Sequence, residues 1–269
     1  MMKNQVEIIV LIIIAAIGHA GCAKPVEAEP NPVSSTNTCT PALFLIATDG
    51  SLSYDFQQMA RRNVEPIIRE GCQGSVLSFW WISADSYLAQ SNIVTTSFDE
   101  PPPACISDNV YDRSCDIKRA VYAKRREQWE RNLISTIASA VNPNAQRTDI
   151  YGFLTVASEK IQQWKGEGPV YIVIFSDLDN NVYKYEKYLT RGALQGAHVI
   201  VAVFEHNTPK IRTAWTKHFQ DWGVAEVTFI PPDESNLRSL ANAIGFGKPA
   251  APVVSTAEGV EVVQAKSGQ

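Results

Sequence analysis

Near-continuous apolar runs alternate along this chain with segments of helical periodicity, and this alternation constrains the fold more than any other feature. Runs such as ALFLIAT (42–48) and PVYIVIF (169–175) are typical of parallel strands that are covered on both faces. Strands are predicted at 42–48, 75–83, 92–98, 169–175, 197–204 and 226–230. Helices are predicted at 54–70, 116–141, 150–164, 211–223 and 235–245, and a further helix is expected to begin within 180–192.

This order of elements predicts an α/β fold. We expect a doubly wound, mostly parallel six-stranded sheet with one antiparallel edge strand and helices on both faces. We expect the antiparallel pair to be formed by strands 75–83 and 92–98, because they are close in sequence. A chain of 269 residues, 45% of them apolar, is long enough for one such domain with a tail at each end. In sheets of this kind, ligands bind beyond the carboxyl ends of the strands.

The first 21 residues have the features of a bacterial signal peptide. Residues 8–17 form an apolar run that is shorter than the roughly 20 residues needed to span a bilayer and that suits a signal-peptide core. Ala20 and Gly21 directly before Cys22 resemble a lipobox, which implies cleavage before Cys22 and a lipid on that residue. Ordinary cleavage after Ala20 is the alternative. The lipobox implies a lipoprotein anchored to a membrane of the bacterial cell envelope and facing the periplasm or the exterior.

Composition sets the other domain boundaries. Residues 22–39 are rich in Pro, Glu, Ser and Asn and are predicted to form a flexible tether. Residues 247–269 are predicted to be a disordered tail, which leaves the folded domain at 40–246. The net charge of −4 is mild and does not suggest the basic surface that nucleic acids require, so no nucleic-acid partner is expected.

The cysteine count fits an exported protein. If Cys22 carries lipid, an even number remains for disulfides, namely Cys39, Cys72, Cys105 and Cys115. Cys39 and Cys72 precede two strands that are expected to be neighbours, which makes their pairing feasible and leaves Cys105 to pair with Cys115. The other two pairings stay open.

Chain direction brings polar side chains from three loops to one edge of the predicted sheet. The strand at 42–48 leads into Asp49, and Ser51 and Ser53 follow at alternate positions. Thr148, before a predicted helix, and Asp177, after strand 169–175, are expected at the same edge. Five oxygen-bearing side chains should therefore converge there.

These five residues resemble the metal-ion-dependent adhesion site of von Willebrand factor type A domains. That family has Asp-x-Ser-x-Ser after its first strand, a Thr that opens a helix in mid-domain and an Asp after its fourth strand. The resemblance covers about 40–246. Two positions differ from the family pattern: Leu178 stands where the family usually has Gly, and Gln146-Arg147 stands where it often has Gly-Gly.

The resemblance implies a site for Mg²⁺, or for Mn²⁺ or Ca²⁺, that docks an Asp or Glu of a protein partner. Mg²⁺ prefers oxygen ligands. Ser51 and Ser53 would then ligate the metal directly, Thr148 would do so directly or through water, and Asp49 and Asp177 would hold metal-bound waters. A binding module, and not an enzyme, is the expected function.

Other interpretations of the same residues stay open. Ser51, Ser53 and Thr148 could cap helices, and Asp177 could close a turn. Asp177 and Asp179 are also reminiscent of Mg²⁺-dependent phosphohydrolases of the haloacid-dehalogenase type, although that family places its Asp-x-Asp on the first strand and not the fourth. A third alternative is a structural assembly component with a vestigial metal site.

The predicted helix 116–141 combines apolar positions with many basic residues. Its inner face is predicted to contain Ile117, Val121, Leu133, Ile137 and Ala140. Acidic residues lie among its cations, which favours a solvated, salt-bridged surface. A face for anionic lipid is the alternative.

Overall fold

The computed structural model describes residues 39–51, 57–97, 101, 103, 113–202, 209–230, 240 and 244. The chain divides into two units, Met1–Thr36 and Asn37–Gln269, and every described residue belongs to the second. The predicted signal peptide, the tether up to residue 38, Cys22, Ser53, Cys105 and the C-terminal tail lie outside the described residues. Within the described part of the chain, no helix is both long and apolar enough to cross a bilayer.

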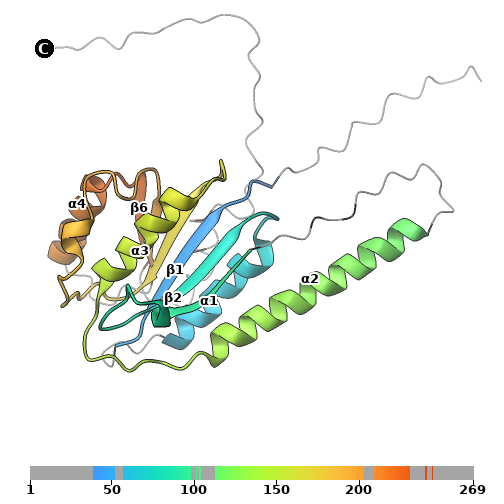
Figure 1. Ribbon diagram of the computed structural model, residues 1–269, viewed down its shortest axis with the longest axis horizontal. Helices are drawn as coiled ribbons and strands as arrows, with labels where there is room; N and C mark the ends of the chain where they lie inside the picture. Colours follow the sequence, from blue (N-terminus) through green and yellow to red (C-terminus); the bar gives the residue numbers. More distant parts are fainter. Residues whose placement is uncertain are drawn as a thin grey trace, which may run out of the picture. The chain divides into compact units, whose positions relative to one another are not determined.

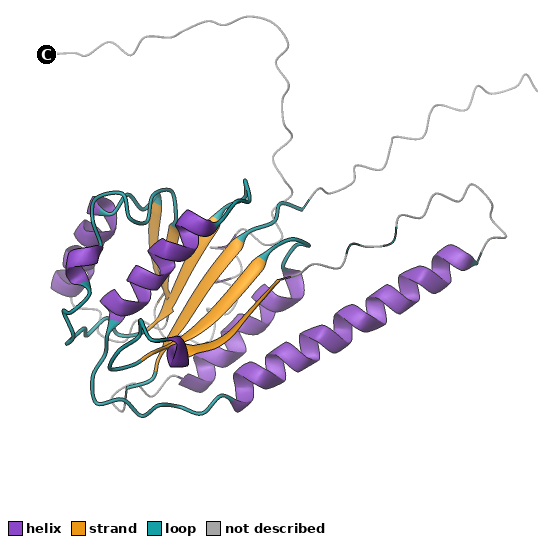
Figure 2. Cartoon of the chain, in the orientation of Figure 1, coloured by secondary structure: helices purple, strands orange, loops and turns teal. Residues whose placement is uncertain are grey.

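A six-stranded, mostly parallel sheet forms the centre of the fold (Figures 1 and 2). The strands are β1 (Leu43–Asp49), β2 (Val76–Ile82), β3 (Asn92–Ser97), β4 (Val170–Phe175), β5 (His198–Ala202) and β6 (Glu226–Ile230). Their order is β3-β2-β1-β4-β5-β6, and only the β2–β3 pair is antiparallel. This is the doubly wound strand order in which ligands bind at the carboxyl edge, near the point where the order reverses between β1 and β4. The predicted fold class is confirmed.

Helices cover both faces of the sheet. They are α1 (Gln57–Glu70), α2 (Ser114–Ser139), α3 (Ile150–Gln163) and α4 (Pro209–Asp221). Because side chains alternate along a strand, β1 sends Leu43 and Leu45 into the core shared with α3 and α4, and Phe44 and Ile46 into the core shared with α1 and α2. Every residue of β1 is buried, as the apolar run predicts.

The segment between β4 and β5 differs from the prediction, and the predicted order of elements is corrected there. The helix expected to begin within 180–192 is absent from this described segment, where a single 3-10 turn, Glu186–Tyr188, is the only helical element. The side chains of Asn181 and Asn180 accept backbone N–H groups from just before α3 and from its first residue, and the phenol of Tyr183 donates to the carbonyl of Asn180. Side-chain bonds of this kind compete with a helix.

The predicted inner face of α2 is not buried in the N-terminal half of the helix. Leu133 and Ile137 are buried as expected, but Ile117 is 63% exposed and Val121 is 45% exposed. Figure 1 shows the reason: the N-terminal half of α2 extends past the helix on which its C-terminal half packs. The predicted inner face is therefore correct only for the C-terminal half.

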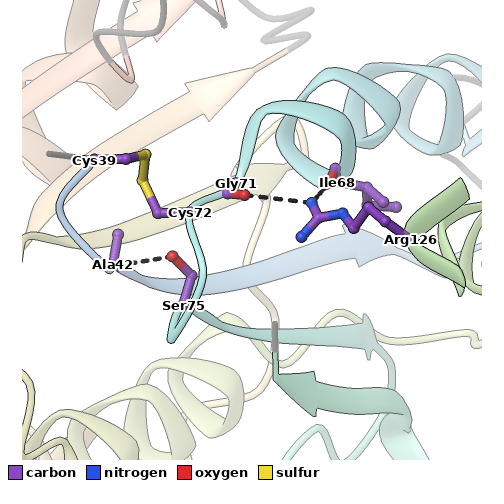
Figure 3. Close-up of a disulfide and its surroundings, with 7 residues drawn as sticks. All are labelled: Cys39, Ala42, Ile68, Gly71, Cys72, Ser75 and Arg126. Atoms are coloured by element: carbon purple, nitrogen blue, oxygen red, sulfur yellow. Dashed lines mark hydrogen bonds between the residues drawn. A yellow bond between two sulfur atoms is a disulfide. The ribbon is translucent and has the colours of Figure 1, made fainter. Parts of the chain in front are cut away.

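A disulfide joins the starts of two neighbouring strands. Cys39 precedes β1 and Cys72 precedes β2, and their Cα atoms are 5.6 Å apart (Figure 3). The feasible pairing predicted from chain direction is thereby confirmed. Cys115, in the first turn of α2, is also disulfide-bonded, while its predicted partner Cys105 lies outside the described residues.

Candidate metal centre at the carboxyl edge of the sheet

Four of the five predicted site residues lie where adjacent parallel strands end. Asp49 is the last residue of β1, Asp177 comes two residues after β4, and β1 and β4 are parallel neighbours. Thr148 lies two residues before α3. Asp49, Ser51, Thr148 and Asp177 are 1%, 4%, 3% and 7% exposed, so all four are buried polar residues. The fifth, Ser53, lies outside the described residues.

Backbone contacts join the loop after β1 to the loop before α3. Ser51 forms an isolated parallel bridge with Ala145, whose N–H donates to the carbonyl of Gly50 at 2.9 Å. A Cβ at position 50 would lie 2.6 Å from the Cγ of Pro143, so the absence of a side chain at Gly50 permits this close approach. The backbone of Ser51 thus belongs to the sheet edge. Residues 52–56, which its hydroxyl would cap in the predicted alternative, lie outside the described residues.

The loop after β4 holds Thr148 through both backbone groups. The N–H of Thr148 donates to Oδ1 of Asn181 at 2.9 Å, and the N–H of Asn181 donates to the carbonyl of Thr148 at 3.1 Å. Oδ1 of Asn180 accepts the N–H of Ile150 at 2.8 Å. These bonds connect segments that are 30 to 33 residues apart in sequence, and they fix the position of Thr148.

The cap of α3 is Asp149 and not Thr148, which corrects one predicted alternative. The carboxylate of Asp149 accepts the N–H of Gly152 at 2.9 Å and that of Ser86 at 3.1 Å. Burial raises the pKa of Asp149 to about 6, although these two hydrogen bonds act in the opposite direction. Since Asp149 fills the capping role, capping does not explain the threonine at 148.

The environment of Asp49 disfavours its negative charge. Burial raises the pKa of Asp49, and the nearby carboxylate of Asp177 raises it further, whereas hydrogen bonds from Ser51 and Ser176 lower it. The N–H of Ser51 donates to Oδ1 at 2.8 Å and the hydroxyl of Ser176 to Oδ2 at 2.9 Å. In the part of the chain that the structure describes, no Lys or Arg forms an ion pair with Asp49. A bound cation would relieve this excess of buried negative charge.

The turn after β4 explains one departure from the family pattern. Leu178 has a φ of 62°, in the left-handed region that favours glycine. Its N–H donates to Oγ of Ser176 at 3.1 Å, its carbonyl accepts Nε1–H of Trp215 at 3.1 Å, and its side chain is in the core. Oδ1 of Asp177 accepts the N–H of Asp179 at 2.9 Å, so the predicted turn-closing role of Asp177 is also present.

Four supporting residues were not singled out from the sequence: Ser176, Asn180, Asn181 and Asp149. Ser176 donates to Asp49, the two asparagines position the loop before α3, and Asp149 links that loop to the loop after β2. The signal that could have found them is their position: Ser176 and Asp149 are adjacent in sequence to predicted ligands, and Asn180 and Asn181 follow in the same loop as Asp177.

The chemistry of the donor set suits a hard cation. Hydroxyl and carboxylate oxygens are the ligands that Mg²⁺ and Ca²⁺ prefer. Among the described residues, no group of three or more His, Cys, Asp or Glu could hold a metal ion. The candidate centre therefore depends on serine and threonine hydroxyls beside only two carboxylates, Asp49 and Asp177.

Comparison with known proteins adds solved structures of low similarity. No known family profile and no curated protein sequence matches the chain. Proximal thread matrix protein 1 from the mussel byssus has a TM-score of 0.41 and 14% identity, over 77% of this chain and 48% of that one. The D319A mutant of the PilB minor pilin from Streptococcus sanguinis has a TM-score of 0.46 and 11% identity, over 81% of this chain and 62% of that one. An aerotolerance-related membrane protein from Bacteroides fragilis has a TM-score of 0.40 and 13% identity, over 76% of this chain and 98% of that one.

This chain thus spans less than two thirds of the length of the first two of these proteins. The fold itself is defined by the sheet of this chain: the order β3-β2-β1-β4-β5-β6, one antiparallel edge strand and helices on both faces. The protein therefore has an α/β fold of the von Willebrand factor type A and Rossmann-like type.

Proposed function

We propose that the protein is a binding module that holds Mg²⁺ at the carboxyl edge of its sheet and docks an Asp or Glu side chain of a protein partner. One observation carries the proposal: Asp49, Ser51, Thr148 and Asp177, from three separate loops, are buried together at the edge where doubly wound sheets bind ligands. Helix capping, the competing explanation, does not account for Thr148, because Asp149 caps α3.

Each residue has a distinct task in this proposal. The hydroxyls of Ser51 and Thr148, together with Ser53 as predicted from the sequence, are neutral ligands for the metal. Asp49 and Asp177 balance its charge, and Ser176 orients the Asp49 carboxylate through its hydrogen bond. A bound Mg²⁺ would supply an electrophilic position to which a carboxylate of the partner coordinates. Few anionic groups of this chain would touch the metal directly, which keeps its affinity for a partner's carboxylate high.

The proposed location follows from the N-terminal sequence. Lipid on Cys22 would anchor the protein to a membrane of the bacterial cell envelope, and the residues up to 39 would tether the domain. The disulfide between Cys39 and Cys72 is compatible with an oxidising compartment. Because it lies at the amino-terminal ends of β1 and β2, the opposite edge with the candidate metal centre is left for a partner.

Titration of the full chain with Mg²⁺ in a calorimeter tests the metal centre. We expect saturable binding that Ser51→Ala and Thr148→Ala each weaken by at least about tenfold, as changes in and around metal ligands do. Ser78→Ala and Thr155→Ala are matched controls, since they remove buried hydroxyls away from this edge and should leave the affinity for Mg²⁺ unchanged. Equal affinities in all five proteins would reject the metal centre.

Docking is tested separately, by capture of partners from a membrane extract on the immobilised full chain. Capture of a specific protein with Mg²⁺, its release by a chelator and its loss in Thr148→Ala support the proposed function. Capture that neither the chelator nor Thr148→Ala affects would leave a metal centre without a docking role, and the proposal would then fail at its second step.

A further inference from the structure

The N-terminal half of α2 has an exposed face that carries aliphatic side chains. Ile117 and Val121 are exposed, while Leu133 and Ile137 are buried against the sheet and α1. Each member of the first pair lies sixteen residues before a member of the second, which corresponds to a rotation of roughly 160° about the helix axis. The two apolar pairs therefore lie on nearly opposite sides of α2.

Cations accompany these exposed aliphatic side chains. Residues 114–126 contain five Lys or Arg residues and one acidic residue, a net charge of +4 in a chain whose net charge is −4. Lys118, Lys124 and Arg125 are exposed and lie within about 100° of Ile117 around the helix. Arg126, on the opposite side, donates to the carbonyls of Ile68 and Gly71 and so attaches α2 to the end of α1 (Figure 3).

A cavity lies on the same face. It has a volume of about 310 Å³ and combines aliphatic, proline and cationic side chains, and its lining consists of Pro101, Pro103, Ile117, Lys118, Val121, Tyr122 and Arg125. An occupant that satisfies this lining needs an apolar part for Ile117 and Val121 and an anionic part for Lys118 and Arg125. Amphiphiles with a negatively charged headgroup have both parts.

The position of this face in the fold also fits a membrane. The chain enters the described domain at Cys39, whose disulfide partner Cys72 directly follows Gly71. Because Arg126 donates to the carbonyl of Gly71, the entry point lies beside the middle of α2 (Figure 3). The entry point lies at the edge of the sheet opposite the candidate metal centre, and the N-terminal half of α2 extends toward that end of the domain (Figure 1).

We propose that the basic face of α2, defined by Ile117, Lys118, Val121, Lys124 and Arg125, docks onto an anionic lipid surface. Lysine and arginine side chains are attracted to anionic headgroups while their alkyl stems lie along the apolar boundary, and aliphatic residues at helical spacing enter that boundary. Docking in this way would fix the orientation of the domain on the membrane and turn the candidate metal centre outward. The inference does not depend on metal binding.

Sedimentation of the full chain with lipid vesicles tests this inference. Vesicles of phosphatidylcholine with phosphatidylglycerol should bind more protein than vesicles of phosphatidylcholine alone, and the difference should shrink at high salt. Lys118→Gln with Lys124→Gln should weaken binding to the anionic vesicles by about 25-fold, since each cation near such a surface contributes about fivefold. Adding Ile117→Ser and Val121→Ser to this variant should weaken vesicle binding further, including at high salt.

The matched control removes two exposed lysines elsewhere. Lys210→Gln with Lys217→Gln on α4 makes the same change in net charge, and it should leave vesicle binding unchanged. Equal losses in the two lysine pairs, or equal binding to the two kinds of vesicle, would overturn the inference. Binding of polyglutamate but not of anionic vesicles would assign this face to an acidic protein segment and would also overturn it. A chelator should have no effect, which separates this result from failure of the metal centre.

Discussion

At the scale of single residues, Leu178 shows how one position can satisfy two opposing demands. Its backbone lies in the left-handed region, where a leucine is disfavoured by about 1 kcal/mol or more. Its side chain is only 2% exposed and lies in the core with α3 and α4. Glycine, the usual residue of von Willebrand factor type A domains at this position, would relieve the backbone strain but would lose the buried side chain.

We predict that Leu178→Gly lowers the free energy of unfolding by about 1–4 kcal/mol. The lost burial of a leucine, about 2–5 kcal/mol, exceeds the relief of the backbone. Urea unfolding measures the change, and Leu194→Gly is the control because Leu194 is a buried leucine without a left-handed backbone. Leu194→Gly should be the more destabilising of the two. If both cost the same, the backbone of Leu178 carries no strain.

At the scale of elements, Asp149 couples the N-terminus of α3 to the loop after β2. Its backbone N–H donates to the carbonyl of Ser83, and its carboxylate accepts from Ser86 and Gly152. Asp149 therefore holds the loop after β2 against the first turn of α3, next to Thr148. Burial disfavours the ionised form of its carboxyl, whereas the hydrogen bonds from Gly152 and Ser86 favour that form.

This conflict predicts a dependence of stability on pH. The pKa of Asp149 is about 6 in the folded protein, above its ordinary value of 3.8, so between these values the folded state binds more protons than the unfolded state. The contribution of Asp149 to the free energy of unfolding should therefore fall as the pH rises from about 4 to 7, by up to about 3 kcal/mol.

Urea unfolding in the presence of a chelator, at pH values across that range, checks this prediction. Asp149→Asn keeps an acceptor for Gly152 but cannot ionise, so the difference in stability between wild type and this variant isolates the effect. A difference that stays constant, or that grows in favour of wild type with rising pH, would contradict the assigned pKa.

At the scale of the whole domain, the disulfide ties the starts of β1 and β2 across 33 residues of sequence. The loop that it closes contains β1 and α1, and the disulfide lies at the sheet edge opposite the candidate metal centre. Ser75 adds a second link there, because its hydroxyl accepts the N–H of Ala42 at 3.0 Å (Figure 3).

We predict that Cys39→Ser with Cys72→Ser lowers the free energy of unfolding by about 3–4 kcal/mol, mainly because the unfolded chain is no longer constrained by a loop of this length. Unfolding under non-reducing conditions measures the change. The affinity for Mg²⁺ should be retained under conditions where the variant is folded. A variant as stable as wild type would show that the disulfide contributes nothing to stability.

Much of the fold could be predicted because its signals are local. The apolar runs of β1 and β4 identify buried strands, and chain direction alone then places Asp49 and Asp177 at one edge. The Cys39–Cys72 pair follows from the same argument. The supporting shell was missed because Ser176 and Asn181 are ordinary polar residues until partners distant in sequence come within hydrogen-bonding distance.

The sequence by itself determined the six strands, the sheet class and the edge at which the oxygen-bearing residues gather, because periodicity and strand direction are properties of neighbouring residues. Only the tertiary structure decided that Asp149 caps α3, that Asn180 and Asn181 replace a helix with a loop, and that Ile117 and Val121 stay exposed. Those outcomes depend on which backbone groups and which helix end lie opposite each side chain, and segments far apart in the sequence supply them.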